Sequence, residues 1–132
     1  MNPYRFDTTK FPLVFLDTVG DITPVQLDAH FDEYRKVLDR DKPYALVYDA
    51  SKIGKVDAVL RKRYAEFMKA NEANFNRLCV GCGFVITSAI VRGALTAVLW
   101  LTGSLPFPHK IFSTRDEAEA WAREQLRSVR AL

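Results

Sequence analysis

The chain has 132 residues, 48% of them hydrophobic, and this supply of apolar side chains is enough to bury the core of one domain spanning residues 1–132. Lys and Arg outnumber Asp and Glu by 19 to 16. Specific duplex binding typically uses about 6–10 phosphate contacts, so a net charge of +3 gives little support to a nucleic-acid-binding function.

Two segments bear on where the protein is located. Residues 1–7 have neither the apolar run nor the small-residue cleavage site of a secretory signal, which predicts a cytoplasmic protein. Residues 84–101 approach the length of a membrane span. Arg92 lies in the middle of this segment and favours a short strand that runs into a packed helix. We therefore expect no membrane span.

The first third of the chain predicts two strands and a helix. Residues 4–8 and 11–19 are rich in β-branched and aromatic types, and the break between them suggests an antiparallel pair. Thr23 followed by Pro24 is a helix start, because the hydroxyl caps free backbone N–H groups and the proline fits the first turn. This helix is expected to stop before Pro43.

Three strand-helix repeats follow, with strands at 44–48, 81–87 and 109–112 and helices at 57–78, at 88–103 and from Thr114 onward. Ser88 can cap the third helix, and Thr114 with Glu117 forms a capping box for the last. The order ββαβαβαβα predicts an α/β fold with a mixed, mostly parallel sheet of about five strands and four helices.

That order and three soft motifs resemble a known family. The motifs are Arg92-Gly93-Ala94-Leu95, the Pro106-Phe107-Pro108-His109 lead into the last strand, and the segment from Asp116 to Trp121. Together they resemble the STAS domain, in particular its SpoIIAA-like subgroup, also described as STAS or Sec14-like. The resemblance covers nearly the whole chain. It implies a non-enzymatic domain that binds a protein partner or a small apolar ligand, commonly with self-association.

The chain departs from the phosphoregulated members of that family at one motif. Those members end a strand in Asp-x-Ser and open the next helix with Asp-Ser-Ser-Gly, whose second serine accepts phosphate. Asp49-Ala50-Ser51 and Asp57 match, but Ala58 and Val59 stand where the two serines belong. Neither has a hydroxyl, so we predict a regulatory or protein-binding module without the kinase-operated switch.

An alternative function is a carrier or sensor of a lipid or other small apolar ligand. The Sec14-like resemblance motivates it, together with the aromatic residues Phe67, Phe75, Phe84, Trp100 and Phe107.

The turn after the strand at 44–48 lies where α/β sheets usually bind ligands. It offers a possible anion or partner site at the start of the second helix, made of Asp49, Ser51, Lys52, Lys55 and Asp57, with Arg61, Lys62 and Arg63 nearby. An ordinary solvated face is the competing interpretation. Asp49 and Asp57 could also form an acid/base pair, but nothing in the sequence fixes their separation.

Cys79-Val80-Gly81-Cys82 is the one recognisable chemical motif, because two thiols at this spacing can form a redox disulfide or half of a zinc site. Zinc needs about four ligands, and His30 and His109 are the only histidines. We predict buried structural cysteines, histidines used for packing or hydrogen bonding, no catalytic residues, and no metal or cofactor.

The third helix is apolar around most of its circumference. Arg92 and Thr96 form a narrow polar stripe, and Leu99 and Trp100 flank it. Such a helix needs cover on more than one side, and three sources of cover remain open: a neighbouring helix of the same chain, a second copy in a homodimer, or an apolar ligand. We predict Arg92, Thr96, Leu99 and Trp100 as a possible interface.

Overall fold

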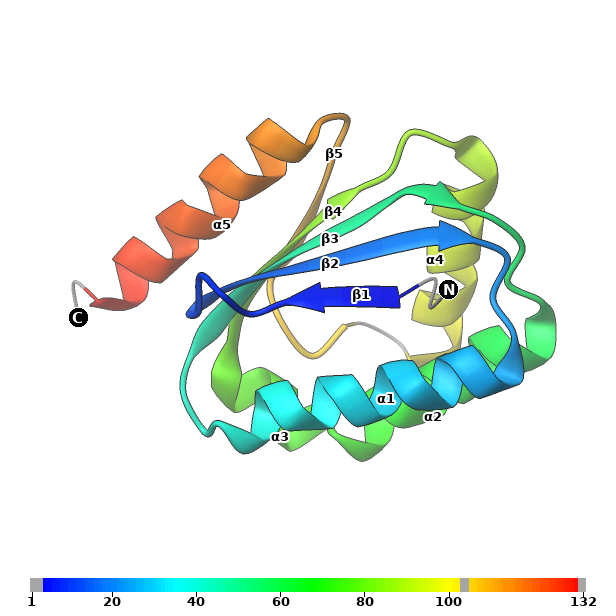
Figure 1. The fold of residues 1–132 in the computed structure, drawn as a ribbon, viewed down its shortest axis with the longest axis horizontal. Helices are drawn as coiled ribbons and strands as arrows, with labels where there is room; N and C mark the ends of the chain where they lie inside the picture. Colours follow the sequence, from blue (N-terminus) through cyan, green and yellow to red (C-terminus); the bar gives the residue numbers. More distant parts are fainter. Residues whose placement is uncertain (1–3, 103–104, 131–132) are drawn as a thin grey trace.

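The computed structural model describes residues 4–102 and 105–130, except for the side chains of residues 4, 94, 97–102 and 130 (Figure 1). Its elements, in chain order, are β1 Tyr4–Asp7, β2 Leu13–Gly20, α1 Pro24–Asp39, β3 Tyr44–Ile53, α2 Ala58–Ala70, α3 Glu72–Leu78, β4 Cys79–Val85, α4 Ala89–Thr102, β5 His109–Phe112 and α5 Arg115–Arg130.

The strands form one five-stranded sheet in the order β1-β2-β3-β4-β5. β1 is antiparallel to β2, and every later pair is parallel. The predicted mixed, mostly parallel α/β sheet is therefore confirmed. Because the parallel strands point the same way, the helices that follow β2, β3 and β4 all begin at one edge of the sheet (Figure 1). We call this edge the carboxyl edge.

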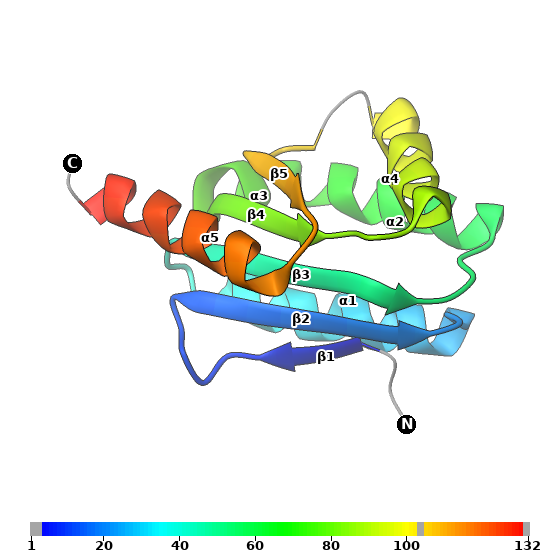
Figure 2. The ribbon, with the colours of Figure 1, turned by 90° about the horizontal axis from the view of Figure 1, so that it is seen from above.

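Helices cover the two faces of the sheet unequally. Helices α1, α2 and α3 lie on one face, and of the helices in the described residues only α5 lies on the other (Figures 1 and 2). Alternate residues of β3 supply both sides: Leu46 and Tyr48 belong to the larger core, whereas Ala45 and Val47 belong to the smaller core under α5. This explains why a central strand is apolar at successive positions.

Helix α5 lies close to β4 because β4 has a glycine at the contact. A Cβ atom built on Gly83 would lie 3.1 Å from the carbonyl oxygen and 3.2 Å from the Cβ of Ala118. Both distances are shorter than ordinary van der Waals contact, so a larger residue would push the helix away. Ala118 and Ala122 are fully buried against the sheet. Small residues on both elements therefore set the spacing between α5 and the sheet.

Three predicted helix starts are confirmed. Thr23 caps α1 through the backbone N–H of Gln26, and the Gln26 side chain accepts from the Thr23 N–H in return. Ser88 accepts from the first turn of α4. The Thr114 hydroxyl accepts from the backbone N–H of Glu117 and donates to the Glu117 carboxylate.

The prediction of a single helix at 57–78 is wrong, because the structure has two helices that meet at Asn71. Asn71 has φ −109° and ψ 15°, and its side-chain amide donates to the Phe67 carbonyl oxygen at 2.9 Å. Short polar side chains of this kind compete with the helical hydrogen bonds of the backbone. The described residues therefore form five helices rather than four.

The strand expected at 44–48 is also longer than predicted, since β3 continues to Ile53. A register irregularity lies where Asp17 pairs with Asp49 and Val19 pairs with Lys52. Two residues of β3 thus lie opposite one residue of β2, as in a β-bulge. Most of the expected loop residues after position 48 therefore belong to the sheet.

Candidate binding site

A cavity of about 100 Å³ lies between the sheet, α2 and α4. Helix α4 packs against α2 near the carboxyl edge of the sheet (Figures 1 and 2). Tyr48 of β3 and Phe84 of β4 line the cavity from the sheet. Val91 and Leu95, one helical turn apart, line it from α4 and are only half-buried.

The cavity lining is almost entirely apolar. Cys82, Ile86 and Phe107 are buried within it, and Met68 and Tyr64 contribute from α2. Pockets for small molecules are typically of this kind, with apolar walls and few polar groups. Most lining residues of the sheet are buried, whereas Arg61, Val91 and Leu95 on the helices are half-buried, and we therefore place the opening of the cavity at these helix residues.

Arg61 is the one charged residue among the described residues that line the cavity. It lies in the first turn of α2 and is half-buried. Its Nη1 donates to the Val56 carbonyl oxygen at 2.8 Å. This bond holds the guanidinium beside the residues that connect β3 to α2.

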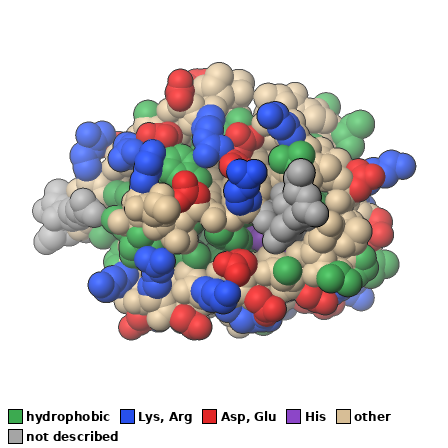
Figure 3. Space-filling view, in the orientation of Figure 1, with side chains coloured by type: hydrophobic (Ala, Val, Ile, Leu, Met, Phe, Trp, Pro, Cys, Tyr) green, Lys and Arg blue, Asp and Glu red, His purple; other side chains and the backbone are tan. Residues whose placement is uncertain are grey.

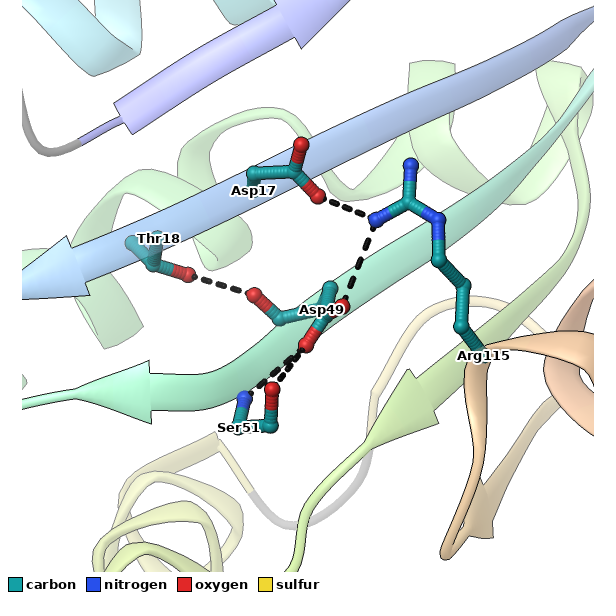
Figure 4. A network of polar contacts seen from close by, with 5 residues as sticks. All are labelled: Asp17, Thr18, Asp49, Ser51 and Arg115. Carbon is teal, nitrogen blue, oxygen red and sulfur yellow. Dashed lines mark hydrogen bonds and ion pairs between the residues drawn. The ribbon is translucent and has the colours of Figure 1, made fainter.

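A separate polar network lies on the α5 face of the sheet (Figure 4). Asp17 of β2 and Asp49 of β3 are direct cross-strand partners, and two like charges so placed repel each other. Arg115, the first residue of α5, forms ion pairs with both carboxylates. Ser51 donates to Asp49 Oδ1 from its hydroxyl at 2.6 Å and from its backbone N–H at 3.0 Å.

The network holds Asp49 and Arg115 in their charged forms. Partial burial raises the pKa of Asp49, but the hydrogen bonds from Ser51 and the Arg115 guanidinium outweigh burial and hold this pKa below its usual value. Burial lowers the pKa of Arg115, and the two aspartates raise it overall. Asp49 is thus ionised and accepts hydrogen bonds on both of its carboxylate oxygens.

The five residues of the predicted anion or partner site have different surroundings in the structure. Asp49 and Ser51 belong to the network with Arg115. The Asp57 carboxylate accepts from the Leu60 N–H at 3.0 Å and so caps α2. Lys52 and Lys55 are exposed. The five residues therefore do not converge on one point, and Asp49 and Asp57 have separate structural partners.

The face shown in Figure 3 carries basic and acidic side chains interspersed, without a broad area of one sign. Four of the six exposed large apolar side chains among the described residues lie at the carboxyl edge, whereas Ile111 and Val129 lie elsewhere. Val19 is 50% exposed at the end of β2, and Val25, Val59 and Ile90 are 78%, 68% and 86% exposed in the first turns of α1, α2 and α4. These three valines and one isoleucine all lie at the carboxyl edge, and we call them the edge patch.

Both cysteines are buried in β4. Burial raises the pKa of Cys79 to about 12. Burial and the neighbouring Cys79 raise the pKa of Cys82 well above its usual value. The thiolate is the reactive form, so both thiols are held in the unreactive state.

His30 is fully buried between two aromatic rings. Its ring stacks on Phe6 at 5.4 Å and on Tyr64 at 5.6 Å between centroids. Burial lowers the pKa of His30 to about 3, so the ring is neutral at physiological pH. His109 is exposed at the start of β5. The structure therefore gives His30 a packing role.

The predicted interface on α4 lies partly outside the described residues. Arg92 and Thr96 are exposed, and the Thr96 hydroxyl donates to the Arg92 carbonyl oxygen at 3.0 Å. The side chains of Leu99 and Trp100 are not among those described, so their part in an interface stays a prediction.

No protein-family model and no curated protein sequence matches the chain. A solved structure does match: an uncharacterized protein of the DUF3478 family from Shewanella loihica PV-4, described as having a SpoIIAA-like fold. The TM-score is 0.62 with 11% sequence identity, over 90% of this chain and 91% of that one. The chain has a SpoIIAA-like fold. This confirms the fold that the sequence motifs implied.

Within this SpoIIAA-like domain, none of the helices in residues 4–102 and 105–130 has the length and apolarity needed to cross a membrane. The sequence placed Arg61 beside the possible anion site at the start of the second helix, without an apolar cavity next to it, and did not single out Tyr48, Tyr64 or Arg115 as site residues. Tyr48 and Tyr64 lie among apolar residues of a strand and a helix. The sequence pattern of such residues is the same whether their side chains pack against protein or line a cavity. Arg115 is one of several arginines on a charged helix.

Proposed function

We propose that this chain is a non-enzymatic binding module and that its ligand site is the apolar cavity beneath α4. The observation that supports the proposal is the cavity itself. It has a volume of about 100 Å³ and one charged group among its described lining residues. Unfilled apolar space forgoes packing contacts and destabilises a protein. A cavity with half-exposed walls is thus suited to a small apolar ligand.

The chemically capable groups have structural roles that support a non-enzymatic function. Asp49 is engaged by Ser51 and Arg115, and Asp57 caps α2. The thiols of Cys79 and Cys82 are protonated. The two carboxylates are thus occupied by structural hydrogen bonds, and burial holds the two thiols in the protonated, unreactive form.

The size of the cavity narrows the alternative of a lipid carrier. An engineered apolar cavity of about 150 Å³ binds benzene. A cavity of about 100 Å³ therefore suits a short branched chain or a small ring rather than a long acyl chain. The ligand class we propose is a small apolar molecule or group.

Binding of toluene, followed by NMR chemical shifts, tests this function with two matched valine variants. Val91→Trp places an indole at the cavity opening, whereas Val25→Trp adds the same side chain at an exposed site on α1. We expect Val91→Trp to weaken toluene binding at least about tenfold and Val25→Trp to leave it unchanged. Equal binding by all three proteins would remove the cavity as the site.

A second candidate function is protein binding at the edge patch. Val59 and Ile90 are more than two-thirds exposed, and burying such side chains contributes roughly 1.5–3 kcal/mol each. Self-association is the form of this function that purified protein can test. If a dimer forms through the edge patch, Ile90→Glu should lower the mass measured by light scattering toward that of a monomer. The control is Ile111→Glu on β5, which should leave the mass unchanged.

A further inference from the structure

The cavity has a cation at its opening. Arg61 belongs to α2 and is half-buried, and Nη1 is held 2.8 Å from the Val56 carbonyl oxygen. A guanidinium has five N–H donors in a planar fork. One donor on Val56 leaves others to meet a ligand, and the bond to the backbone limits the orientations that the side chain samples.

No carboxylate in the described part of the chain forms an ion pair with Arg61. Asp57, one turn earlier in the chain, is committed to the Leu60 N–H as the cap of α2. The neighbouring Arg63 differs, because it pairs with Asp28 on α1. Arg61 is thus a positive charge that the described protein does not neutralise, next to an apolar cavity.

We propose that the ligand is a small amphiphilic monocarboxylate, whose apolar group fills the cavity and whose carboxylate binds Arg61. This inference rests on the proposed function, and it adds that the ligand carries a negative charge. Arginine binds carboxylates through two parallel hydrogen bonds. An apolar group of about four to six carbon atoms is the size that the cavity accommodates. The half-exposed position of Arg61 lets the carboxylate stay at the opening.

The test compares 4-methylpentanoate with its neutral isostere 4-methylpentanamide by isothermal titration calorimetry. The variants are Arg61→Gln, the conservative Arg61→Lys, and Lys62→Gln as a control that removes an exposed charge from the same helix. Charge-assisted hydrogen bonds typically correspond to about a tenfold to hundredfold difference in affinity. We expect wild type and Lys62→Gln to bind the acid at least about tenfold more tightly than the amide. Arg61→Gln should lose this preference, and Arg61→Lys should keep part of it.

The outcomes separate the two proposals. Equal binding of acid and amide by the wild type, or a preference that survives in Arg61→Gln, overturns the carboxylate inference and leaves the cavity as a site for neutral ligands. Binding of neither compound overturns the carboxylate inference, and the toluene titration then decides whether the cavity binds anything. Val91→Trp should weaken the binding of both compounds to the same extent if they occupy the cavity.

Discussion

Arg115 Nη1 lies 3.3 Å from Asp49 Oδ2, and this ion pair joins the first turn of α5 to the middle of β3. The same guanidinium pairs with Asp17, which lies directly across from Asp49 in the neighbouring strand. The Cζ atom of this guanidinium also lies 4.8 Å from the centre of the Phe15 ring. One side chain therefore bridges two adjacent carboxylates and fastens the only helix on that face among the described elements.

Replacing Arg115 with Gln should destabilise the fold by about 1–2 kcal/mol, because two facing aspartates lose their shared cation. The estimate is modest because the three side chains remain partly exposed. Urea unfolding measures the change. Arg123→Gln is the control, since it removes an exposed pair within α5 and should cost less than about 0.5 kcal/mol.

The Arg115 effect should depend on pH. The pKa of Asp49 is lowered in the folded protein, so its contribution to stability is present above the unfolded pKa, near 3.8, and is lost as pH falls through the folded pKa. The difference between wild type and Arg115→Gln should therefore shrink in acid. A difference that stays constant from pH 7 down to pH 2 would show that the ion pairs are not its source.

Acid should destabilise the protein through His30. Its folded pKa of about 3 lies below the ordinary value of 6.5, so the unfolded chain takes up the proton first. Stability is then complete above about pH 6.5 and falls as pH decreases toward 3, by roughly 3–5 kcal/mol at the lower limit. His30→Phe should flatten the fall between pH 6.5 and 4, whereas His109→Gln at an exposed site should leave it unchanged.

The two cysteines should react with a thiol reagent only after unfolding. Both are buried, and burial raises the pKa of each, which removes the thiolate that the reagent requires. At pH 8 we expect labelling at least about a hundredfold slower in the native protein than in urea. Rapid native labelling of Cys82 would mean that the cavity opens to admit the reagent.

Two glycine substitutions should have opposite effects on stability. Gly83→Ala brings a methyl group to within 3.1–3.3 Å of Ala118 on α5, so we expect a loss of about 1–3 kcal/mol. Gly93→Ala in α4 meets nothing within 4 Å and should stabilise the helix by about 0.5–1 kcal/mol. Thermal unfolding of both variants measures the signs. Stabilisation by Gly83→Ala would mean that α5 is not held as closely as the structure shows.

Much of the fold could be predicted because its determinants are local. Thr23, Ser88 and Thr114 mark helix starts through side chains that cap the backbone within three residues. The order of strands and helices then restricts the topology. The break at Asn71 was missed because asparagine within a continuous apolar stripe is also tolerated inside a helix.

The candidate site could be predicted only in part, because it depends on contacts between distant residues. Arg115 pairs with Asp17, 98 residues earlier in the chain, and nothing near either residue indicates the partner. The cavity depends on how α4 lies against α2 and the sheet. Val91 and Leu95 have the same spacing whether they meet side chains or enclose a space. The sequence indicated an apolar ligand as one alternative, and the cavity supplies a place for it.

A crystal structure of the protein grown with 4-methylpentanoate tests the central claim most directly. We expect the branched chain between α4, α2 and the sheet, in contact with Tyr48 and Phe84, and the carboxylate within hydrogen-bond distance of Arg61. A cavity left empty at saturating ligand, or a ligand bound elsewhere on the surface, would contradict the account.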